Sequence, residues 1–273
     1  MSTIKRIAIF GVTGRMGQSL LLALREPPAL RAGAAFILSG AIASPQSGRL
    51  GQDAAADGAP TGVLITSDAG LGIQGASVAL DFSSSGAVAA HTKACAAARV
   101  PILIGVTGVD SASRAVLERA AGSIPVLVAP NTSVGVGVVA KLVSMATLGL
   151  GPDYDVEIFE AHHRMKRDAP SGTALALGEA VARARGVSLD EVATMNRAGQ
   201  NAPRTPGSIG FSSLRAGDIV GEHTVTFAAA GERIEITHRA TDRITFARGA
   251  LRAAEWLVGR PAGLYGMQNV LGL

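Results

Sequence analysis

Short apolar runs alternate with longer amphipathic segments through the first half of the chain. The apolar runs predict strands at residues 4–10, 36–43, 62–66, 77–82, 100–105 and 124–129. The segments between them predict helices at residues 18–25, 86–98 and 111–121. Strands that alternate with helices in this way are typical of a parallel, doubly wound α/β sheet.

The pattern changes after residue 132. A long apolar segment at 133–150 predicts a helix, and it is followed by an alternating strand at 154–160 and a helix at 174–184. Further alternating stretches predict strands at 207–214, 222–229 and 233–240, before a final helix at 248–257. We therefore expect an α/β domain formed by residues 1–132 and 243–273, and a smaller α+β domain with an open mixed sheet over residues 133–242.

The first predicted strand runs into the glycine-rich turn G-V-T-G-R-M-G at 11–17 and then into a helix. Gly11 allows a tight turn, Gly14 lets a pyrophosphate approach the backbone, and Gly17 lets the helix pack on the strand. A structural turn without a ligand would also use glycine, and the spacing is G-x-x-G-x-x-G. Its position after the first strand favours a Rossmann-like dinucleotide site.

The segment 160–168, E-A-H-H-R-M-K-R-D, collects proton donors and cations. Histidines titrate at about pH 6.5, so His162 and His163 can exchange protons near neutrality. Lys166, Arg164 and Arg167 would repel one another unless an anion lay among them. A solvated polar loop is the alternative interpretation, but the segment leads directly into a rigid turn and a helix.

That helix is expected to begin beside the cationic segment. Ser171 is a suitable N-cap residue, which leaves the backbone N–H groups of Gly172 and Thr173 at the positive end of the helix dipole. Such a helix terminus binds carboxylate or phosphate groups. The sequence therefore predicts a site for a small anionic substrate that must gain a proton.

The composition narrows the ligand class. The formal net charge is +4, but the basic residues are scattered and are not interleaved with aromatic residues, which make up only 4% of the chain. Small anionic ligands explain this balance better than nucleic acid. Cys95 is the single cysteine, so neither a disulfide nor a cysteine metal cluster is expected. No apolar run reaches transmembrane length and no signal peptide precedes the first strand, so we expect a cytoplasmic protein without membrane partners.

Several motifs together resemble the 4-hydroxy-tetrahydrodipicolinate reductase (dihydrodipicolinate reductase) family of bacterial lysine biosynthesis. They are the turn at 11–17, D-F-S at 81–83, G-V-T-G at 105–108, A-P-N-T-S-V-G-V at 129–136, E-A-H-H-R-M-K-R-D-A-P-S-G-T-A at 160–174, R-A-G-D-I-V-G-E-H at 215–223 and I-T-H-R-A at 236–240. The resemblance runs essentially from end to end, and its most specific part is the segment with the histidine pair.

The resemblance implies an NAD(P)H-dependent reduction of a cyclic dicarboxylate imine to tetrahydrodipicolinate, with loss of water. It implies His162 as the catalytic histidine, Lys166 as the proton donor, and substrate carboxylates held by His163, Gly172 and Thr173. It also implies a homotetramer built on the sheet of the second domain. Cofactor contacts are expected at Gly11, Val12, Thr13, Gly14, Arg15, Met16, Ser44, Phe82, Gly105, Val106, Thr107, Ala129, Pro130, Asn131 and Thr132.

The chain departs from the family pattern at two places. Ala43 and Ser44 stand where many relatives have an acidic residue followed by arginine, so no carboxylate meets the ribose hydroxyls or repels a 2′-phosphate. We therefore expect NADPH to be accepted at least as well as NADH, with Arg15 or Arg49 as candidates to bind the phosphate. Met165 replaces a third histidine of some relatives.

Two rival functions remain open. One is a redox sensor that binds NADP(H) without catalysis, and the other is a different imine or amino-acid dehydrogenase on the same scaffold. A sensor would have no need of a proton donor beside a dicarboxylate site, which favours an enzyme.

Overall fold

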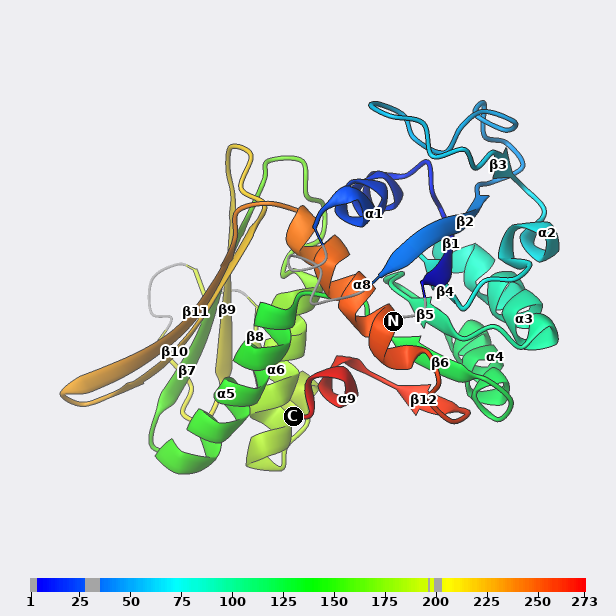
Figure 1. Cartoon of the computed structure of the whole chain (residues 1–273). Helices are drawn as coiled ribbons and strands as arrows, with labels where there is room; N and C mark the ends of the chain where they lie inside the picture. Colours follow the sequence, from blue (N-terminus) through cyan, green and yellow to red (C-terminus); the bar gives the residue numbers. More distant parts are fainter. Residues whose placement is uncertain (1–3, 28–34, 196, 199–202) are drawn as a thin grey trace. The chain divides into compact units, whose positions relative to one another are not determined.

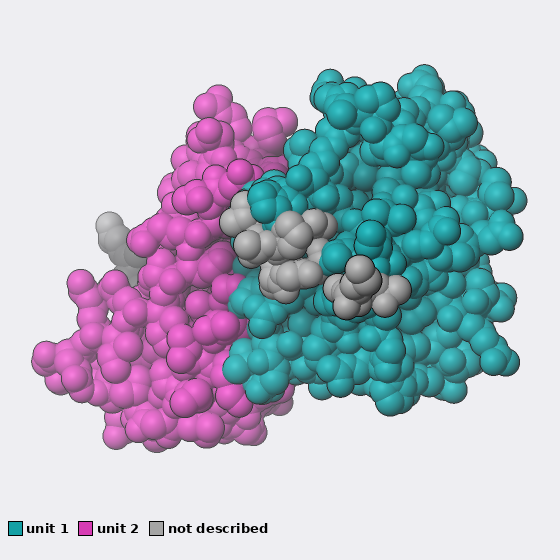
Figure 2. Space-filling view, in the orientation of Figure 1, with its two compact units in different colours: residues 1–134, 244–273 teal, residues 135–243 magenta. Residues whose placement is uncertain are grey.

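The computed structural model describes residues 4–27, 35–195, 197–198 and 203–273. The chain divides into two compact units, which are residues 1–134 with 244–273 (unit 1) and residues 135–243 (unit 2), as Figure 2 shows by colour. The chain thus leaves unit 1 once, forms unit 2 as one continuous segment, and returns.

Unit 1 is built on a parallel sheet that has seven strands within the described residues. The strand order is β12-β6-β5-β4-β1-β2-β3. The bounds are β1 (Lys5–Phe10), β2 (Phe36–Ile42), β3 (Ile65–Thr66), β4 (Val78–Asp81), β5 (Ile102–Ile104), β6 (Pro125–Val128) and β12 (Gly263–Tyr265). Because the strands are parallel, their carboxyl ends all lie along one edge, where ligands of doubly wound sheets bind.

Helices cover both faces of this sheet (Figure 1). On one face, α1 (Arg15–Arg25), α8 (Ile244–Leu257) and α9 (Met267–Leu271) pack on a core that includes Ile7 and Ile9. On the other, α2 (Ala69–Ile73), α3 (Val88–Ala98) and α4 (Ser111–Ala121) pack on a core that includes Ala8 and Phe10. Successive residues of β1 therefore serve opposite faces, and both are apolar, as expected of a buried parallel strand. A short 3₁₀ helix, η2 (Ser85–Ala87), precedes α3.

Unit 2 is built on a mixed sheet with five strands in the described part, in the order β11-β10-β7-β9-β8. The central strand β7 (Asp155–His162) runs antiparallel to β10 (Gly221–Ala229) and parallel to β9 (Ile209–Arg215). The outer strands are β8 (Ala193–Thr194) and β11 (Glu232–Ala240). Helices α5 (Val134–Leu150) and α6 (Gly172–Arg185) bury one sheet face, and α7 (Leu189–Val192) follows α6.

The predicted fold class is confirmed, since a parallel α/β sheet is joined by a smaller mixed-sheet unit. Several local predictions were wrong. β7 continues through His162 instead of ending at Glu160, α1 begins at Arg15 instead of Gln18, and α8 begins at Ile244 instead of Arg248 and is followed by a further helix. The short elements α2, α7, α9, β8 and β12 were not predicted at all. Among the described residues, no helix combines the length and apolarity needed to span a membrane.

Candidate active site

The alternation of β7 places two polar side chains on the face that is covered by helices. Val156 and Ile158 belong to the core beneath α6, and the same two-residue period brings Glu160 and His162 onto that face. Both are buried, with 0% and 8% of their surface exposed. Buried ionisable groups need partners, and the neighbouring strands supply them.

Arg215, at the end of β9, makes a bidentate ion pair with Glu160. Its Nη1 lies 2.8 Å from Oε2 and its Nη2 lies 2.6 Å from Oε1. The parallel register, which pairs His162 with Arg215, brings the guanidinium beside the carboxylate. Burial alone would raise the pKa of Glu160, but hydrogen bonds from Arg215, Ser213 and His162 outweigh it and hold the pKa at about 2. Glu160 is therefore a carboxylate at neutral pH.

His162 is oriented by this carboxylate. Its Nδ1 lies 2.6 Å from Glu160 Oε2. Burial lowers the pKa of His162 and outweighs the opposing effect of Glu160, while the charges of Lys166 and Arg215 lower it further. The ring is then neutral near pH 7. Because the carboxylate can only accept, Nδ1 keeps its proton and donates the hydrogen bond, which leaves Nε2 as an acceptor. A Cβ at Gly221 would lie 3.0 Å from Nε2, so the glycine leaves room beside this atom.

Lys166 is held close to the same cluster. Its Nζ lies 2.8 Å from Asp168 Oδ2, and Arg215 Nη2 donates a 2.6 Å hydrogen bond to the backbone oxygen of Asp168. Burial would raise the pKa of Asp168, but the hydrogen bond from Lys166 prevails and the pKa lies below its usual range. Two backbone hydrogen bonds, from Arg164 to Gly217 and from Ala216 to His162, join the segment to the end of β9.

The N-terminus of α6 joins the cluster through Ser171. The Ser171 Oγ caps the helix by accepting a 3.1 Å hydrogen bond from the Ala174 N–H, and the Ser171 N–H donates to Glu160 Oε1 at 3.2 Å. Gly172 and Thr173 form the first turn, and a Cβ at Gly172 would meet nothing within 4 Å. The predicted anion site is thus linked to the Glu160 and His162 pair, and the space beside Gly172 is open.

A second histidine, His223 of β10, contacts the Ser171 side chain. Its Nε2 lies 2.9 Å from Ser171 Oγ, and its ring packs edge-on against His162 with centroids 5.1 Å apart. Burial and the neighbouring His162 lower the pKa of His223 to about 4. Sequence reasoning gave no role to Glu160, Arg215 or His223. All three lie within motifs that carry the family resemblance, which was the available signal.

His163 follows the end of β7 and is half-buried. Its backbone oxygen accepts a 3.1 Å hydrogen bond from the Lys166 N–H, which closes the turn between the two residues. Met165, within this turn, is 77% exposed. The five residues predicted to hold or protonate the substrate therefore lie on one short stretch, between the end of β7 and the first turn of α6.

In unit 1 the glycine turn is shaped by close backbone contacts. Gly11 has φ +76°, and a Cβ there would lie 2.6 Å from the backbone oxygen of Phe82. A Cβ at Gly17 would lie 2.4 Å from the backbone oxygen of Gly11. A Cβ at Gly105 would lie 2.1 Å from the Phe82 ring. The first strand, the Phe82 segment and α1 can therefore pack together at this turn only because these positions have no side chains. A pyrophosphate site requires such a glycine turn, in which the backbone is closely approached.

The other residues predicted to contact the cofactor differ in what they can offer. Val12 and Ala129 are buried in the core, and Thr132 is buried with its Oγ1 donating to Phe246 O at 2.7 Å. These residues can meet a ligand only through their backbone. Val106 and Pro130, by contrast, line a pocket of about 250 Å³ beside α4.

The predicted 2′-phosphate region is ordered by its own hydrogen bonds. Ser44 Oγ bonds to the Gln46 side chain, and Arg49 Nη2 donates to the backbone oxygens of Asp53 and Ala55 at 2.9 and 2.8 Å. Arg15 is exposed, and its side chain has no hydrogen bond or ion pair within the described residues. Arg49 is thus engaged by its own loop, whereas Arg15 is available.

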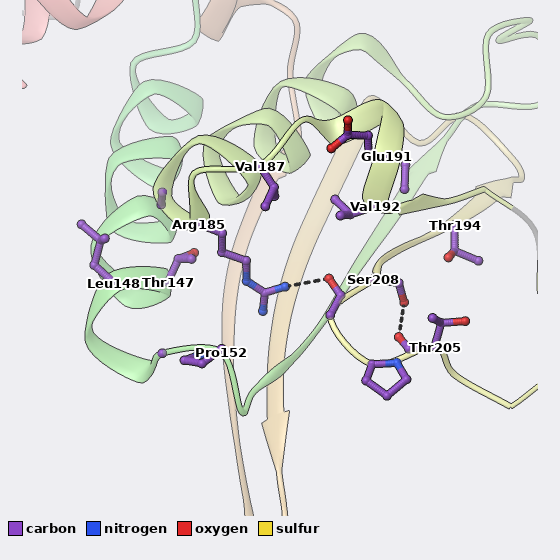
Figure 3. A pocket seen from close by; sticks show the side chains of 15 residues that line it. Thr147, Leu148, Pro152, Arg185, Val187, Glu191, Val192, Thr194, Thr205 and Ser208 are labelled. Carbon is purple, nitrogen blue, oxygen red and sulfur yellow. Dashed lines mark hydrogen bonds between the residues drawn. The ribbon is translucent and has the colours of Figure 1, made fainter.

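A larger pocket, of about 700 Å³, lies in unit 2 between the ends of α5, α6 and α7 and the start of β9. Figure 3 shows Leu148, Val187 and Val192 around it, with Arg185 donating a 3.1 Å hydrogen bond to Gly207 O. It contains none of the predicted site residues.

The chain matches two family models over almost its whole length. Residues 5–132 match the N-terminal model of dihydrodipicolinate reductase, and residues 135–271 match the C-terminal model. The chain belongs to the dihydrodipicolinate reductase family. Members of this family are NAD(P)H-dependent oxidoreductases of lysine and diaminopimelate biosynthesis.

Individual relatives agree with the family models. The 4-hydroxy-tetrahydrodipicolinate reductase of Thiobacillus denitrificans is 51% identical over 98% of both chains, and that of Bordetella parapertussis is 50% identical over 100% of this chain and 99% of its own. A solved structure of a dipicolinate-bound dihydrodipicolinate reductase from Paenisporosarcina is similar with a TM-score of 0.72 at 24% identity, covering 98% of this chain and 99% of that one, and supports the fold.

Proposed function

We propose that this chain catalyses the NAD(P)H-dependent reduction of (2S,4S)-4-hydroxy-2,3,4,5-tetrahydrodipicolinate to tetrahydrodipicolinate, with loss of water. The observation that carries the proposal is the cluster in unit 2, where a carboxylate-oriented histidine, a lysine and the open first turn of α6 lie on one short stretch of chain. The activity is that for which the full-length relatives are named. We assign cofactor binding to unit 1, and substrate binding and subunit association to unit 2.

The nicotinamide cofactor, when bound, supplies the hydride. The glycine turn at 11–17 and the edge formed by Phe82, Gly105 and Ala129 fit a dinucleotide, because a Cβ at Gly11 or Gly17 would collide with the backbone. The N-terminus of α1, which begins at Arg15 without a side-chain cap, would face the pyrophosphate. Unit 1 thus holds and orients the cofactor.

Lys166 would donate the proton that the ring nitrogen of the substrate gains. An ammonium group carries protons at neutral pH, whereas the lowered pKa of His162 leaves that ring neutral with Nε2 as an acceptor. Asp168 holds the Lys166 Nζ in place before the transfer. His162 would then orient the substrate or the departing water through Nε2.

The substrate carboxylates would be held by the first turn of α6 and by His163. The helix dipole and the open space beside Gly172 favour an anion there. The Thr173 N–H and hydroxyl would add hydrogen bonds, which are stronger to a charged acceptor.

A turnover assay with freshly prepared imine and NADPH tests the proposal and separates it from its rivals. A sensor would bind NADP(H) without turnover, and another dehydrogenase would prefer a different imine or amino acid. In the same assay, Lys166→Ala should lower kcat by at least about a hundredfold, because a positioned acid contributes roughly 10²–10⁴-fold.

Lys141→Ala, at an exposed lysine of α5, is the matched control for Lys166→Ala and should keep the wild-type kcat. His162→Ala should lose about as much as Lys166→Ala. Near-normal kcat in both site variants would place the chemistry elsewhere.

We further propose that NADPH binds at least as well as NADH. Ala43 is 6% exposed and brings no carboxylate to the ribose site, and Arg15 is available for a 2′-phosphate, which supports the proposal. Arg49 is the weaker candidate because its loop already uses it.

A homotetramer is also proposed, built on the unit 2 sheet. The face opposite α5 and α6 leaves Phe159 and Leu214 42% and 43% exposed. Large apolar side chains exposed on a sheet are typical of surfaces that another copy covers.

A further inference from the structure

The Glu160 carboxylate is surrounded by protein donors. Arg215 donates to both of its oxygens at 2.8 and 2.6 Å, His162 Nδ1 lies 2.6 Å from Oε2, and the Ser171 N–H donates to Oε1 at 3.2 Å. A carboxylate has about four acceptor sites. Since the protein fills them, Glu160 has none left for a substrate, and any role in the reaction must act through its neighbours.

Arg215 uses one guanidinium to connect two parts of the site. The group that binds Glu160 also donates a 2.6 Å hydrogen bond to the backbone oxygen of Asp168, whose carboxylate holds Lys166 at 2.8 Å. Only the planar fork of an arginine can hold a carboxylate with two bonds and a carbonyl with another in fixed directions. The His162 ring and the Lys166 segment are therefore anchored to the same ion pair.

We propose that Glu160 and Arg215 are positioning residues that act on both candidate catalytic groups at once. Glu160 fixes His162 as the tautomer with Nδ1 protonated and Nε2 free to accept, and Arg215 fixes the segment that carries Lys166. The inference deepens the proposed function and rests on it for the roles of His162 and Lys166. A role in stability alone is a weak explanation, because a buried ion pair often stabilises a fold no more than apolar residues of similar volume.

Glu160→Gln tests the tautomer. The glutamine amide places an NH₂ group where one carboxylate oxygen accepted hydrogen bonds. This NH₂ group then faces donors from Arg215, His162 or Ser171. The Ser213 hydroxyl, which also bonds to Glu160, can rotate to accept, and His162 can move its proton to the other ring nitrogen, whereas neither a guanidinium nor a backbone N–H can become an acceptor. His162 Nδ1 lies only 2.6 Å from the carboxylate. We therefore expect the NH₂ to face His162, and the imidazole to switch to the tautomer with Nε2 protonated.

The switch can be read directly by NMR of protein with ¹⁵N-labelled histidine, at about pH 8 where an ordinary imidazole is neutral. The charged or titratable groups facing His162 are Glu160, Arg215, Lys166 and His223. The wild type should show Nδ1 protonated, and Glu160→Gln should show Nε2 protonated. The kcat of Glu160→Gln should fall by about tenfold to a hundredfold, by analogy with the loss of a carboxylate that orients a metal-binding histidine.

Arg215→Lys separates the effect on the His162 tautomer from the effect on the segment that carries Lys166. It keeps a cation beside Glu160, so the His162 tautomer should stay as in the wild type. The bond to Asp168 is lost, so kcat should still fall by about tenfold or more. This variant also keeps the inference testable if Glu160→Gln does not fold.

Glu157→Gln is the matched control. Glu157 lies on the same strand, β7, and also pairs with arginines, Arg197 and Arg204, but it faces the opposite side of the sheet. It should leave both kcat and the His162 tautomer unchanged.

An unchanged His162 tautomer in Glu160→Gln, or a wild-type kcat in Arg215→Lys, would overturn the positioning role. Losses in the control equal to those in the site variants would do the same. A wild type without any turnover of the imine would contradict the proposed function instead, while the NMR comparison would still decide whether Glu160 sets the tautomer.

Discussion

At the scale of single residues, His223 links the site to the pH dependence of stability. Its pKa is about 4 in the folded protein, below the ordinary value of 6.5, because of burial and the neighbouring His162. Between these values the unfolded chain binds the proton and the folded protein does not. The stabilising effect is therefore complete above pH 6.5 and is lost as the pH falls toward 4.

We expect the free energy of unfolding to fall by a few kcal/mol across this window, on the order of 3 kcal/mol from His223. His162 and His238, whose pKa values are also lowered, contribute in the same direction. In His223→Gln the fall should be clearly smaller. Denaturant titrations of both proteins at several pH values provide the measurement, and an identical pH dependence would contradict the assignment.

The proposed acceptance of NADPH also depends on the chemistry of one side chain. Arg15 is exposed and makes no side-chain bond within the described chain, so it can bind a 2′-phosphate. A hydrogen bond to a charged group contributes about 1.5–3 kcal/mol. Arg15→Ala should therefore weaken the binding of NADPH by about tenfold or more.

NADH is the internal control for Arg15→Ala, and its binding should change little. The NADPH contact should also weaken as salt is raised. Titration of both cofactors against both proteins decides the matter. Equal losses for the two cofactors would mean that Arg15 contacts the pyrophosphate. A wild type that binds NADH at least about tenfold more tightly than NADPH would contradict the proposal that NADPH binds at least as well.

Residue chemistry could be predicted from the sequence where neighbours in the chain are neighbours in space. His162, Lys166 and Gly172 lie within ten positions of one another along the chain, so their proximity was predictable from the sequence. Glu160 is as close to His162, but its partner Arg215 comes from another strand, and the register of β7 against β9 was needed to bring them together. His223 reaches Ser171 across a further strand pair in the same way.

At the scale of elements, the turn between β1 and α1 makes a strict demand on Gly17. A Cβ there would lie 2.4 Å from Gly11 O and 2.5 Å from Val12 O, both of which are backbone atoms of the turn itself. Overpacking of this kind destabilises by about 1–3 kcal/mol, and the turn must shift to relieve it. Gly17→Ala should therefore lower the unfolding temperature and reduce the affinity for NADH and NADPH equally.

Gly149→Ala is the control for Gly17→Ala, because a Cβ at Gly149 of α5 would meet nothing within 4 Å. Alanine is favoured over glycine in a helix by up to about 1 kcal/mol, so this variant should be no less stable than the wild type. Calorimetry and fluorescence titration with NADH and NADPH provide the comparison. Unchanged cofactor binding in Gly17→Ala would show that the turn does not hold the pyrophosphate.

Among the elements, the long and periodic ones were predictable and the short ones were not. The longer strands of unit 1 are recognisable in the sequence as apolar runs. β12, by contrast, has only three residues, Gly263–Tyr265, and its position is set by pairing with β6. The end of β7 was missed because Glu160, Ala161 and His162 combine polar side chains with a buried strand. Local strand propensity does not predict such a combination, whereas the partners that the site supplies to Glu160 and His162 explain it.

At the scale of the whole molecule, the exposed face of the unit 2 sheet predicts association. Phe159→Asp would place a charge on the strand that carries the 42% exposed phenylalanine. Because burying an unpaired charge is costly, light scattering should give a mass near that of a tetramer of 27.6 kDa subunits for the wild type and a smaller mass for Phe159→Asp.

Leu71→Asp, at a 63% exposed leucine of α2 in unit 1, is the control for Phe159→Asp. It should keep the wild-type mass. A monomeric wild type, or a Phe159→Asp protein that keeps the wild-type mass, would contradict association through this sheet.

The return of the chain from unit 2 to unit 1 has a consequence for the order of folding during synthesis. Unit 2 is one continuous segment, whereas unit 1 receives α8, β12 and α9 only from residues that are made after unit 2. α8 alone buries seven residues, among them Leu251 and Leu257, on one face of the unit 1 sheet. The first half of the chain to be made is therefore the last to complete its core. A chain that is released after residue 243 would carry all of unit 2, whereas the unit 1 face that α1, α8 and α9 cover together would keep only α1 and would expose the rest of its apolar surface to chaperones.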